Sequence, residues 1–341
     1  MNDRFLRACW REPVDCTPVW FMRQAGRSSP SYRAIRAKHG ILEIAKSPDL
    51  AAEVTLQAVQ DLGVDAAILF ADLLLPIEAM GVRVRIDAGE GPVVEPPIRT
   101  PEDLNRLKPL NPSRDLPFVF ETIRRVRTKA AVPCIGFAGA PFTMASYLIE
   151  GGASREFAAT KSFLHAHPAE WRILMDLLVD GTAGYLRAQV EAGAQALQVF
   201  DSWAGALSPQ EYDASVFPFT RRLFREIRET GVPCIHFGTG TAGFLESFAA
   251  AGGDVVGIDW RIPIDAAWQR IGADRGIQGN LDPTALLAPP ELWRPAAEDV
   301  LRRVGGRPGH VFNLGHGVLP ETRPDDLRTL VRLVHDATRR S

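Results

Sequence analysis

The feature that most constrains the fold of this chain is a recurring unit: a short apolar run, a turn of glycine and polar residues, and a longer helical pattern. The apolar runs are continuous and aliphatic rather than alternating, which is typical of parallel strands covered on both faces. Eight such runs lie at residues 18–21, 66–71, 133–138, 196–200, 233–237, 255–258, 276–279 and 310–314. Eight strands that alternate with helices predict a closed (β/α)8 barrel, the TIM barrel of the α/β class.

The segments between the runs have helical patterns. Residues 50–63, 170–193, 216–231 and 292–305 each end in glycine, a common residue just past a helix C-terminus. One connection is longer, because residues 82–116 hold two short strand-like pieces and a Pro-rich stretch before a helix over 118–129. No linker divides the 341 residues, so we interpret residues 1–341 as one barrel domain with a short N-terminal extension before the first strand.

Composition and charge argue against several classes of protein. The net charge of −2, with both signs interspersed, gives no electrostatic footprint for nucleic acid or an anionic membrane. No stretch approaches the ~18 uninterrupted apolar residues of a membrane span, and the N-terminus lacks the apolar region of a signal peptide. The four cysteines have neither CxxC nor metal-finger spacing. We therefore expect a reduced, cytoplasmic protein with neither nucleic acid nor membrane as a partner.

Polar residues follow the apolar runs at the points where strands would end. In a (β/α)8 barrel the active site lies at these carboxyl ends. The residues in question include two arginines, several carboxylates, a serine and a histidine: Arg23, Arg27, Asp72, Asp201, Ser202, Asp259, Asp282 and His316. Their convergence on one mouth predicts a reaction site for an anionic substrate.

Arg23 and Arg27 stand four apart in the segment MRQAGR. A guanidinium offers a planar fork of donors that matches a carboxylate bidentately, which lysine cannot reproduce. The ordinary alternative is a surface or ion-paired arginine. The position directly after a buried strand, with Gly26 relaxing the backbone, favours carboxylate binding.

Asp72 and His316 each have a functional and a plain structural interpretation. Asp72 follows the apolar run AAILF, where an unpaired charge is costly to bury. It could merely cap the next helix, although Pro76 makes a regular helix start at Asp72 less natural. His316 lies between two glycines, and its structural alternative is a turn histidine bonded to the backbone.

Residues 238–243 (GTGTAG) match the GxGxxG pattern and have Asp259 after the next strand, which is the spacing of a dinucleotide fingerprint. This unit is, however, the fifth in a series rather than the opening unit of a Rossmann half. Phosphate-binding loops late in a barrel also produce such patterns. A dehydrogenase is therefore a disfavoured alternative, and no nucleotide cofactor is predicted.

The segments PVWFMRQAGR, FADLLLP, GFAGAPFTMASYLIEGG, QVFDSWAG, QGNLDP and FNLGHGVLPET together resemble the uroporphyrinogen decarboxylase family, in the family's order from Pro18 to Thr322. The resemblance implies a single (β/α)8 domain that forms a homodimer with its two clefts facing each other. It also implies a carboxy-lyase that converts uroporphyrinogen III to coproporphyrinogen III in haem and related tetrapyrrole synthesis, with no metal or organic cofactor.

The family's site residues carry over onto matching motifs. The resemblance places its substrate arginines on Arg23 and Arg27, its central aspartate on Asp72, its tyrosine on Tyr147, its serine on Ser202 and its histidine on His316. Gln24, Ala25 and Phe200 lie in the same motifs and are expected to shape the cleft. Two departures concern the rim: SSPSY at 28–32 replaces the usual Tyr-Leu-Pro-Glu-Tyr, and Ala71 replaces a serine before the aspartate.

The reaction suits these residue types. A pyrrole acetate loses CO2 only if the electrons left behind have a sink, and protonating a pyrrole carbon makes the ring itself that sink, as pyridoxal phosphate is elsewhere. Arg23 and Arg27 would hold carboxylates, and an ionised Asp72 would stabilise the ring cation through the pyrrole N–H groups. The proton donor stays open between His316, favoured by its ordinary pKa, and one of the arginines, so the predicted catalytic residues are Asp72, Arg23 and His316.

Two other classes compete with this interpretation. A zinc- and corrinoid-linked methyltransferase needs His and Cys ligands at strand ends, but His236-Phe237-Gly238 and Gly315-His316-Gly317 offer no cysteine, so no metal site is predicted. A non-catalytic tetrapyrrole carrier could use the same arginines and aspartate. Only turnover separates a carrier from an enzyme.

Overall fold

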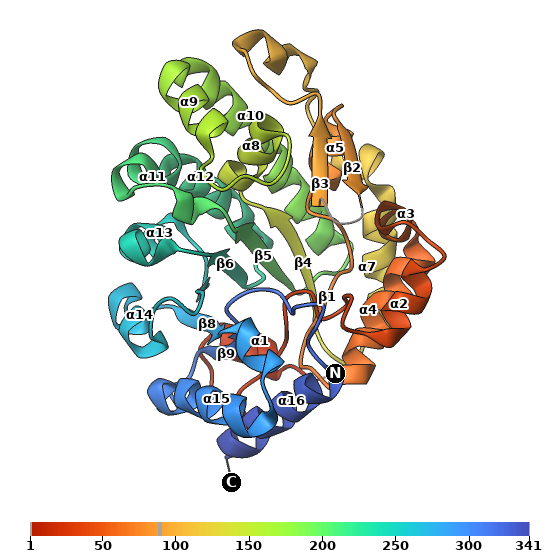
Figure 1. Ribbon diagram of the computed structural model, residues 1–341, viewed down its shortest axis with the longest axis vertical. Helices are drawn as coiled ribbons and strands as arrows, with labels where there is room; N and C mark the ends of the chain where they lie inside the picture. Colours follow the sequence, from red (N-terminus) through yellow and green to blue (C-terminus); the bar gives the residue numbers. More distant parts are fainter. Residues whose placement is uncertain (1, 88–90, 341) are drawn as a thin grey trace.

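The computed structural model describes residues 2–87 and 91–340. Within those residues, seven parallel strands form a curled sheet in the order β1-β4-β5-β6-β7-β8-β9, with helices around it (Figure 1). The strands are β1 (Ala67–Ile68), β4 (Cys134–Gly139), β5 (Ala196–Asp201), β6 (Cys234–Gly238), β7 (Val255–Gly257), β8 (Gly276–Leu281) and β9 (His310–Leu314). Each coincides with one of the predicted apolar runs, which confirms the predicted TIM-barrel fold class.

The prediction of a first strand at residues 18–21 is wrong. Residues 18–21, all of them described, make only a single parallel bridge, between Val19 and Phe312 of β9. Pro18 has no N–H to donate, and the N–H of Val19 donates to the carboxylate of Asp65 at 2.8 Å instead of to a neighbouring strand. The segment still links the two edges of the sheet, because Pro18 O accepts from Phe312 N at 2.9 Å and Val19 O accepts from Asp65 N at 2.8 Å.

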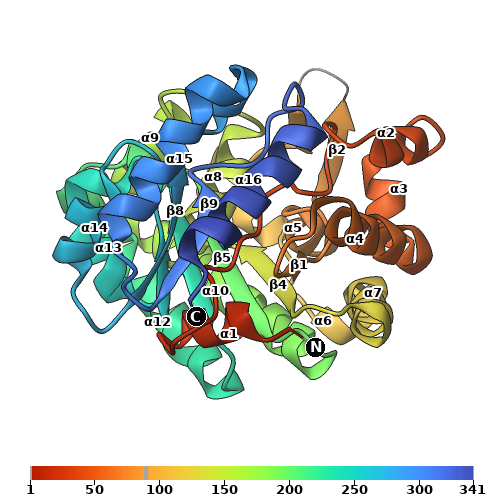
Figure 2. The same cartoon turned by 90° about the horizontal axis from the view of Figure 1, so that it is seen from below.

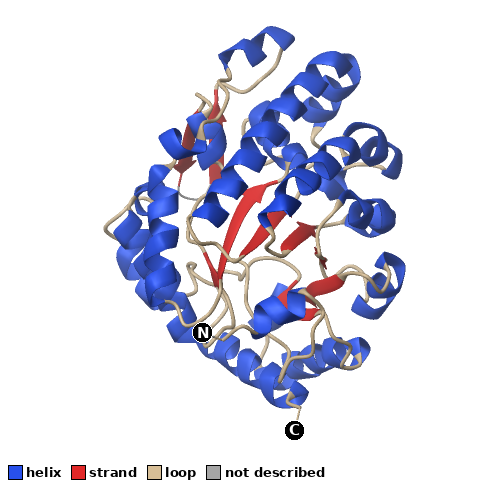
Figure 3. Ribbon diagram, turned by 180° about the vertical axis from the view of Figure 1, so that it is seen from behind, coloured by secondary structure: helices blue, strands red, loops and turns tan. Residues whose placement is uncertain are grey.

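Helices cover the outside of the sheet (Figure 3). The predicted helical segments correspond to α4 (Pro48–Leu62), α7 (Pro117–Lys129), α10 (Pro168–Glu191), α12 (Phe217–Ile227) and α15 (Pro290–Val304). Gly63 and Gly305 end α4 and α15 in the left-handed conformation, as the sequence indicated. No helix in the described part of the chain combines the length and apolarity that crossing a bilayer requires.

The remaining helices are shorter, apart from the last. They are α1 (Arg4–Cys9), α2 (Pro30–Arg36), α3 (Ile41–Lys46), α5 (Leu75–Ala79), α6 (Pro112–Asp115), α8 (Pro141–Glu150), α9 (Ala158–Ala166), α11 (Pro209–Ser215), α13 (Leu245–Ala251), α14 (Ile264–Ile271) and α16 (Pro324–Thr338). Short 3-10 turns lie at Pro101–Arg106, Ala204–Ala206, Arg228–Thr230, Thr241–Phe244 and Pro283–Leu287.

The long connection after β1 forms a hairpin outside the main sheet. Its strands, β2 (Arg83–Asp87) and β3 (Gly91–Glu95), pair antiparallel, which confirms the two strand-like pieces expected in this stretch. The hairpin is anchored to the end of α8, because Val94 N donates to Gly151 O at 2.8 Å. Figure 1 shows it rising beyond the sheet beside α5, where residues of the hairpin reach the cleft described below.

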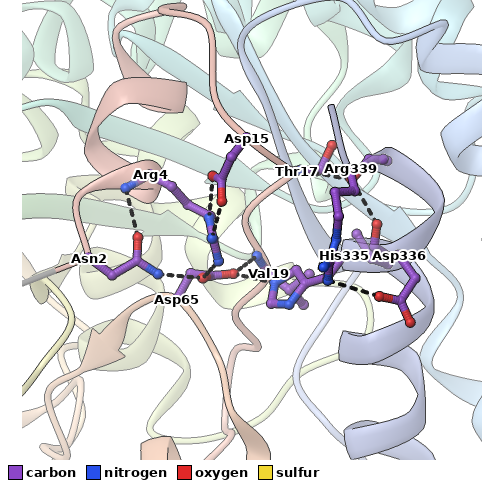
Figure 4. Close-up of polar contacts among 11 residues, drawn as sticks. Asn2, Arg4, Asp15, Thr17, Val19, Asp65, His335, Asp336 and Arg339 are labelled. Carbon is purple, nitrogen blue, oxygen red and sulfur yellow. Dashed lines mark hydrogen bonds and ion pairs between the residues drawn. The ribbon is translucent and has the colours of Figure 1, made fainter. Parts of the chain in front are cut away.

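The N-terminal extension and the last helix meet where the sheet edges are joined (Figure 2). The centre of this junction is Asp65, which is 2% exposed. Its carboxylate accepts hydrogen bonds from Val19 N (2.8 Å), His335 Nε2 (2.7 Å), Arg4 Nη1 (2.7 Å) and Asn2 Nδ2 (3.0 Å) (Figure 4). Burial alone would raise the pKa of Asp65, but these bonds and the charge of Arg4 outweigh it and lower the pKa. Asp65 therefore fastens the two ends of the chain to the bridging segment.

Candidate active site

A cleft of about 550 Å³ opens at the carboxyl ends of the strands. The residues that the family motifs assigned to the site line it, apart from Gln24: Arg23, Ala25, Arg27, Asp72, Tyr147, Phe200, Ser202 and His316. These residues come from five separate places in the sequence, and the fold brings them to one mouth. Three other carboxylates predicted at this mouth from their position after a strand do not line the cleft: Asp201, Asp259 and Asp282.

Gln24 supports the cleft from beneath. Its side chain is 2% exposed, and its Oε1 accepts from Phe21 N while its Nε2 donates to Ala66 O, both at 3.1 Å. These two bonds tie the turn that carries the arginines to the residue just before β1. The structure thus places Gln24 behind the lining, where it holds the backbone.

The arginine turn has an unusual backbone. Arg23 has φ of 61°, a left-handed conformation that non-glycine residues rarely adopt and that costs on the order of 1–3 kcal/mol. Gly26 is required beside it, because a Cβ there would lie 2.7 Å from Arg23 O. Within the ranges that the structure describes, neither Arg23 nor Arg27 forms an ion pair, and both are exposed. Two guanidinium groups that are free to meet an anionic ligand therefore face the cleft, and the charge of Arg23 also acts on Asp72.

Gly317 leaves room for the Arg23 side chain. A Cβ built at Gly317 would lie 2.5 Å from Arg23 Cδ and 3.0 Å from its Nε. We expect Gly317→Ala to displace the guanidinium and to lower kcat/KM about 10- to 100-fold, because small misplacements of a positioned group are costly in a preorganised site. Thermal unfolding should change little. The matched control is Gly243→Ala, where an added Cβ meets nothing within 4 Å; equal kcat/KM in the two variants would contradict the packing argument.

Asp72 lies two residues before the start of helical conformation at Leu74. Its Oδ1 accepts from Leu74 N at 2.8 Å, so part of its carboxylate closes a local turn, as the capping alternative suggested. Asp72 also lines the cleft. Burial raises the pKa of Asp72, and the hydrogen bond from Leu74 and the charge of Arg23 only partly oppose that effect. An acid with a raised pKa in a cleft is a common sign of a functional carboxylate.

Aromatic side chains form the walls. Tyr147 on α8 packs against Trp203 with ring centroids 4.0 Å apart, and Phe200 meets Phe137 and Phe237 edge-on at 5.5 and 5.9 Å. Burial, together with the negative charge of Asp72, raises the pKa of Tyr147 to about 12, so its hydroxyl stays protonated and can donate a hydrogen bond. The cleft therefore combines apolar ring surfaces with a few polar groups.

His316 is neutral in this arrangement. Burial lowers its pKa to about 4, and the nearby charges of Arg23 and Arg261 act in the same direction. The N–H of Gly317 donates to His316 Nδ1 at 2.7 Å, which leaves the imidazole proton on Nε2. At neutral pH the ring can donate a hydrogen bond from Nε2, but it carries no positive charge before a ligand binds.

The glycines of the GTGTAG segment serve loop packing. Gly240 has φ of 69°, and its N–H donates to Asp259 Oδ2 at 2.7 Å. Thr239 Oγ1 donates to Ser202 O at 2.6 Å, so this loop supports the one that carries Ser202. Gly205 lies so close to the Thr239–Gly240 backbone that a Cβ there would collide with it. These contacts account for the pattern that resembled a dinucleotide fingerprint.

Several lining residues were not predicted from the sequence. Thr143 and Trp203 follow predicted strands inside the motifs GAPFT and QVFDSWAG but were not assigned a site role, although position after a strand was an available signal. Ile86 and Pro92 reach the cleft from the β2–β3 hairpin, and Tyr32 reaches it from α2. No local sequence pattern predicts those contacts, because they depend on how distant segments pack.

The fold and the cleft together define a TIM-barrel enzyme with its site at the carboxyl ends of the strands. A family model described as uroporphyrinogen decarboxylase (URO-D) matches residues 1–337. The chain is 56% identical to the uroporphyrinogen decarboxylase of Solibacter usitatus over 98% of each chain. It is 52% identical to that of Carboxydothermus hydrogenoformans over 98% of this chain and 97% of the relative. The chain belongs to the uroporphyrinogen decarboxylase family.

Among solved structures, a methyltransferase from Methanosarcina mazei superposes with a TM-score of 0.82 at 22% identity, covering 98% of each chain. That likeness concerns the fold alone. In residues 2–87 and 91–340, no group of three or more His, Cys, Asp or Glu side chains is arranged to hold a metal ion.

Proposed function

We infer that this chain removes the carboxyl groups of the four acetate side chains of uroporphyrinogen III, giving coproporphyrinogen III and CO2. Membership of the uroporphyrinogen decarboxylase family supports this activity. The structural observation that carries it is the meeting of Asp72 with Arg23, Tyr147 and His316 in one aromatic cleft. That combination suits a flat, apolar ring system with anionic side chains.

Each decarboxylation exchanges a carboxylate for a proton. A proton adds to a pyrrole carbon, and the ring becomes a cation. The bond between the acetate CH2 and its carboxylate then breaks, CO2 leaves, and the electron pair neutralises the ring as an exocyclic methylene. Protonation of the methylene and loss of the first ring proton give a methyl group and restore the pyrrole. One proton is consumed for each CO2 released.

The proposed roles follow from charge and position. Arg23 and Arg27 hold substrate carboxylates through bidentate, charge-assisted hydrogen bonds. Asp72, ionised, accepts hydrogen bonds from pyrrole N–H groups and stabilises the ring cation as it forms. Tyr147 donates from its protonated hydroxyl, and Ser202 does the same from the loop after β5. Ala25 and Phe200 shape the surface against the ring.

The state of His316 bears on the proton donor. With a pKa of about 4 it is neutral at neutral pH, so it acts in the free protein as a hydrogen-bond donor to a carboxylate. A bound carboxylate would raise that pKa and allow His316 to carry a proton during the reaction. Arg23 is the alternative donor. We therefore propose Asp72, Arg23 and His316 as the catalytic residues, with the donor one of the last two.

The reaction as proposed needs no metal or organic cofactor, because the protonated pyrrole ring is its own electron sink. The test is anaerobic incubation of purified, chelator-treated protein with uroporphyrinogen III, followed by mass analysis for stepwise loss of CO2. We expect products that lack one to four carboxyl groups. Binding without mass loss would indicate a tetrapyrrole carrier, and activity that returns only with added zinc would overturn the cofactor-independent mechanism.

Arg27→Lys tests the carboxylate clamp. The lysine keeps the charge but loses the planar fork, so we expect kcat/KM to fall by the equivalent of about 1.5–3 kcal/mol, the range for a hydrogen bond to a charged group. The control is Arg33→Lys, since Arg33 donates to the backbone carbonyls of Arg27 and Ser28 rather than lining the cleft. An unchanged kcat/KM for Arg27→Lys would show that Arg27 does not grip a substrate carboxylate.

We propose further that the chain works in the cytoplasm as a homodimer with facing clefts, and that residues 1–341 form one domain. Family resemblance supports the dimer, and the buried, unpaired state of all four cysteines agrees with a reducing compartment. Sedimentation of the purified protein over a range of concentrations measures the oligomeric state directly.

A further inference from the structure

A pair of titratable groups lies buried behind the cleft, and none of the roles above uses it. Asp201 ends β5 and His236 lies in the middle of β6, and both side chains are 0% exposed. Asp201 Oδ2 and His236 Nε2 are 3.9 Å apart, which is near enough for electrostatic attraction but too far for a hydrogen bond. A carboxylate that is fully buried beside a histidine is rare unless something fixes it there.

Thr143 is the group that fixes it. Thr143 Oγ1 donates to Asp201 Oδ1 at 2.9 Å, and the same oxygen accepts from Trp203 N at 3.4 Å. Thr143 lines the cleft in the first turn of α8, and Tyr147 lines it one turn later on the same helix face. The backbone reinforces the junction, because Ala140 N donates to Phe200 O at 2.8 Å. The Asp201 carboxylate is thus tied through one hydroxyl to α8 and to the loop of Trp203, which together carry one wall of the cleft.

The surroundings of His236 favour a neutral ring. Burial lowers the pKa of His236, the carboxylate of Asp201 opposes this, and the more distant charge of Arg275 adds to the lowering. The other faces of the ring are covered by Phe248, whose ring is stacked at 3.6 Å, and by Phe224 at 4.7 Å. In the described part of the chain Asp201 Oδ2 has no hydrogen-bond partner, so the hydrogen bond from Thr143 to Oδ1 carries much of the stabilisation of the Asp201 carboxylate.

Packing alone is a poor explanation for such a pair. Buried charged groups can often be replaced by apolar side chains of similar volume with no loss of stability. A buried carboxylate that accepts a hydrogen bond instead fixes the direction in which the donor side chain points. Here that donor, Thr143, lies one turn before Tyr147 on α8 and accepts a hydrogen bond from Trp203 N, while the Tyr147 and Trp203 rings pack against each other.

We propose that Asp201 is a positioning residue for the decarboxylation, acting through Thr143 to set the geometry of the Tyr147–Trp203 wall. His236 lies against the free oxygen of the carboxylate and limits its rotation. The proposal rests on the proposed function, because it assigns a role within that reaction.

Thr143→Val, which keeps the shape and removes the hydroxyl, is the test. We expect kcat to fall about 10- to 100-fold, as for loss of a hydrogen bond to a charged group, with KM for uroporphyrinogen III nearly unchanged. Thr143→Ser restores the hydroxyl and should recover most of the rate. Asp201→Asn should lower kcat in the same way, and adding it to Thr143→Val should cost little more, because both changes break one linkage.

Thr122→Val is the matched control, since Thr122 is also buried, on α7, but among the described residues its hydroxyl bonds only to Phe118 O of its own helix. The positioning role is overturned if kcat falls no further in Thr143→Val than in this control, or if Thr143→Ser does not recover the rate. The proposed function stays intact in that case as long as the wild-type protein is active. An inactive wild-type protein overturns both. If the valine variant does not fold, wild-type kcat in Asp201→Asn refutes the proposal by itself.

Discussion

Asp72→Asn is expected to fold as well as the wild-type protein and to decarboxylate uroporphyrinogen III about 100- to 1,000-fold more slowly, the usual effect of removing one preorganised electrostatic group. Asparagine keeps the volume and an acceptor oxygen for the N–H of Leu74, so the local turn survives. What disappears is the negative charge that would balance a protonated pyrrole ring. The loss should therefore appear in kcat.

The raised pKa of Asp72 fixes the sign of the stability change. Because burial raises its pKa in the folded state, the folded protein prefers the protonated acid, and this stabilising preference is lost as pH rises above the ordinary value of about 3.9. At neutral pH the ionised carboxylate therefore lowers the free energy of unfolding, and replacing Asp72 by asparagine removes this destabilising charge. Asp72→Asn should consequently unfold at the same temperature as the wild-type protein or a higher one. Catalytic loss combined with unchanged or greater stability is the expected signature.

Asp72→Glu keeps the charge and moves it by about one methylene, ~1.5 Å, a displacement that can reduce turnover ~100-fold in a preorganised site. Asp282→Asn is the matched control, because Asp282 also follows a strand and accepts from the N–H two residues on, that of Thr284, yet does not line the cleft. Turnover and thermal unfolding of all three variants should be measured together. Near-wild-type turnover in Asp72→Asn would refute the catalytic role of Asp72 and leave it a structural residue that closes the local turn.

The cleft residues in sequence motifs could be predicted because their signal is local. A polar residue directly after a continuous apolar run is at a strand end, and parallel strand ends share one edge of a barrel. Five of the polar residues predicted in this way do lie in the cleft: Arg23, Arg27, Asp72, Ser202 and His316.

Other features depend on packing between distant segments. Whether residues 18–21 form a strand is decided by Asp65, which takes the N–H of Val19 from the ladder. The protonation state of His316 also depends on packing. From the sequence alone its pKa is expected to be that of an ordinary histidine, but burial and the neighbouring Arg23 lower the pKa to about 4. The sequence also did not show that the Gln24 side chain lies behind the cleft lining, since its position in the MRQAGR motif suggested contact with ligand.

Asp65→Asn is expected to give a large loss of stability. Its carboxylate accepts four hydrogen bonds, two of them from the side chains of Arg4 and His335 (Figure 4). An asparagine presents a donor where one carboxylate oxygen accepted, so at least two partners lose their acceptor. Because Arg4 and His335 keep some access to water, we place the cost at about 3 kcal/mol, the lower end for breaking a buried ion pair.

The pH dependence gives this prediction a second, independent measurement. The pKa of Asp65 is lowered in the folded state, so its contribution is fully present above the unfolded value of about 3.9 and is lost as pH falls through the lower, folded value. The difference in free energy of unfolding between wild type and Asp65→Asn, taken from urea titrations, should therefore shrink below about pH 4. Asp336→Asn, an exposed change in the same region whose ion pair with Arg339 is open to solvent, should leave the midpoint nearly unchanged at every pH. A difference between wild type and Asp65→Asn that persists undiminished in acid would mean that the junction is held by packing of α1 and α16 rather than by the Asp65 charge.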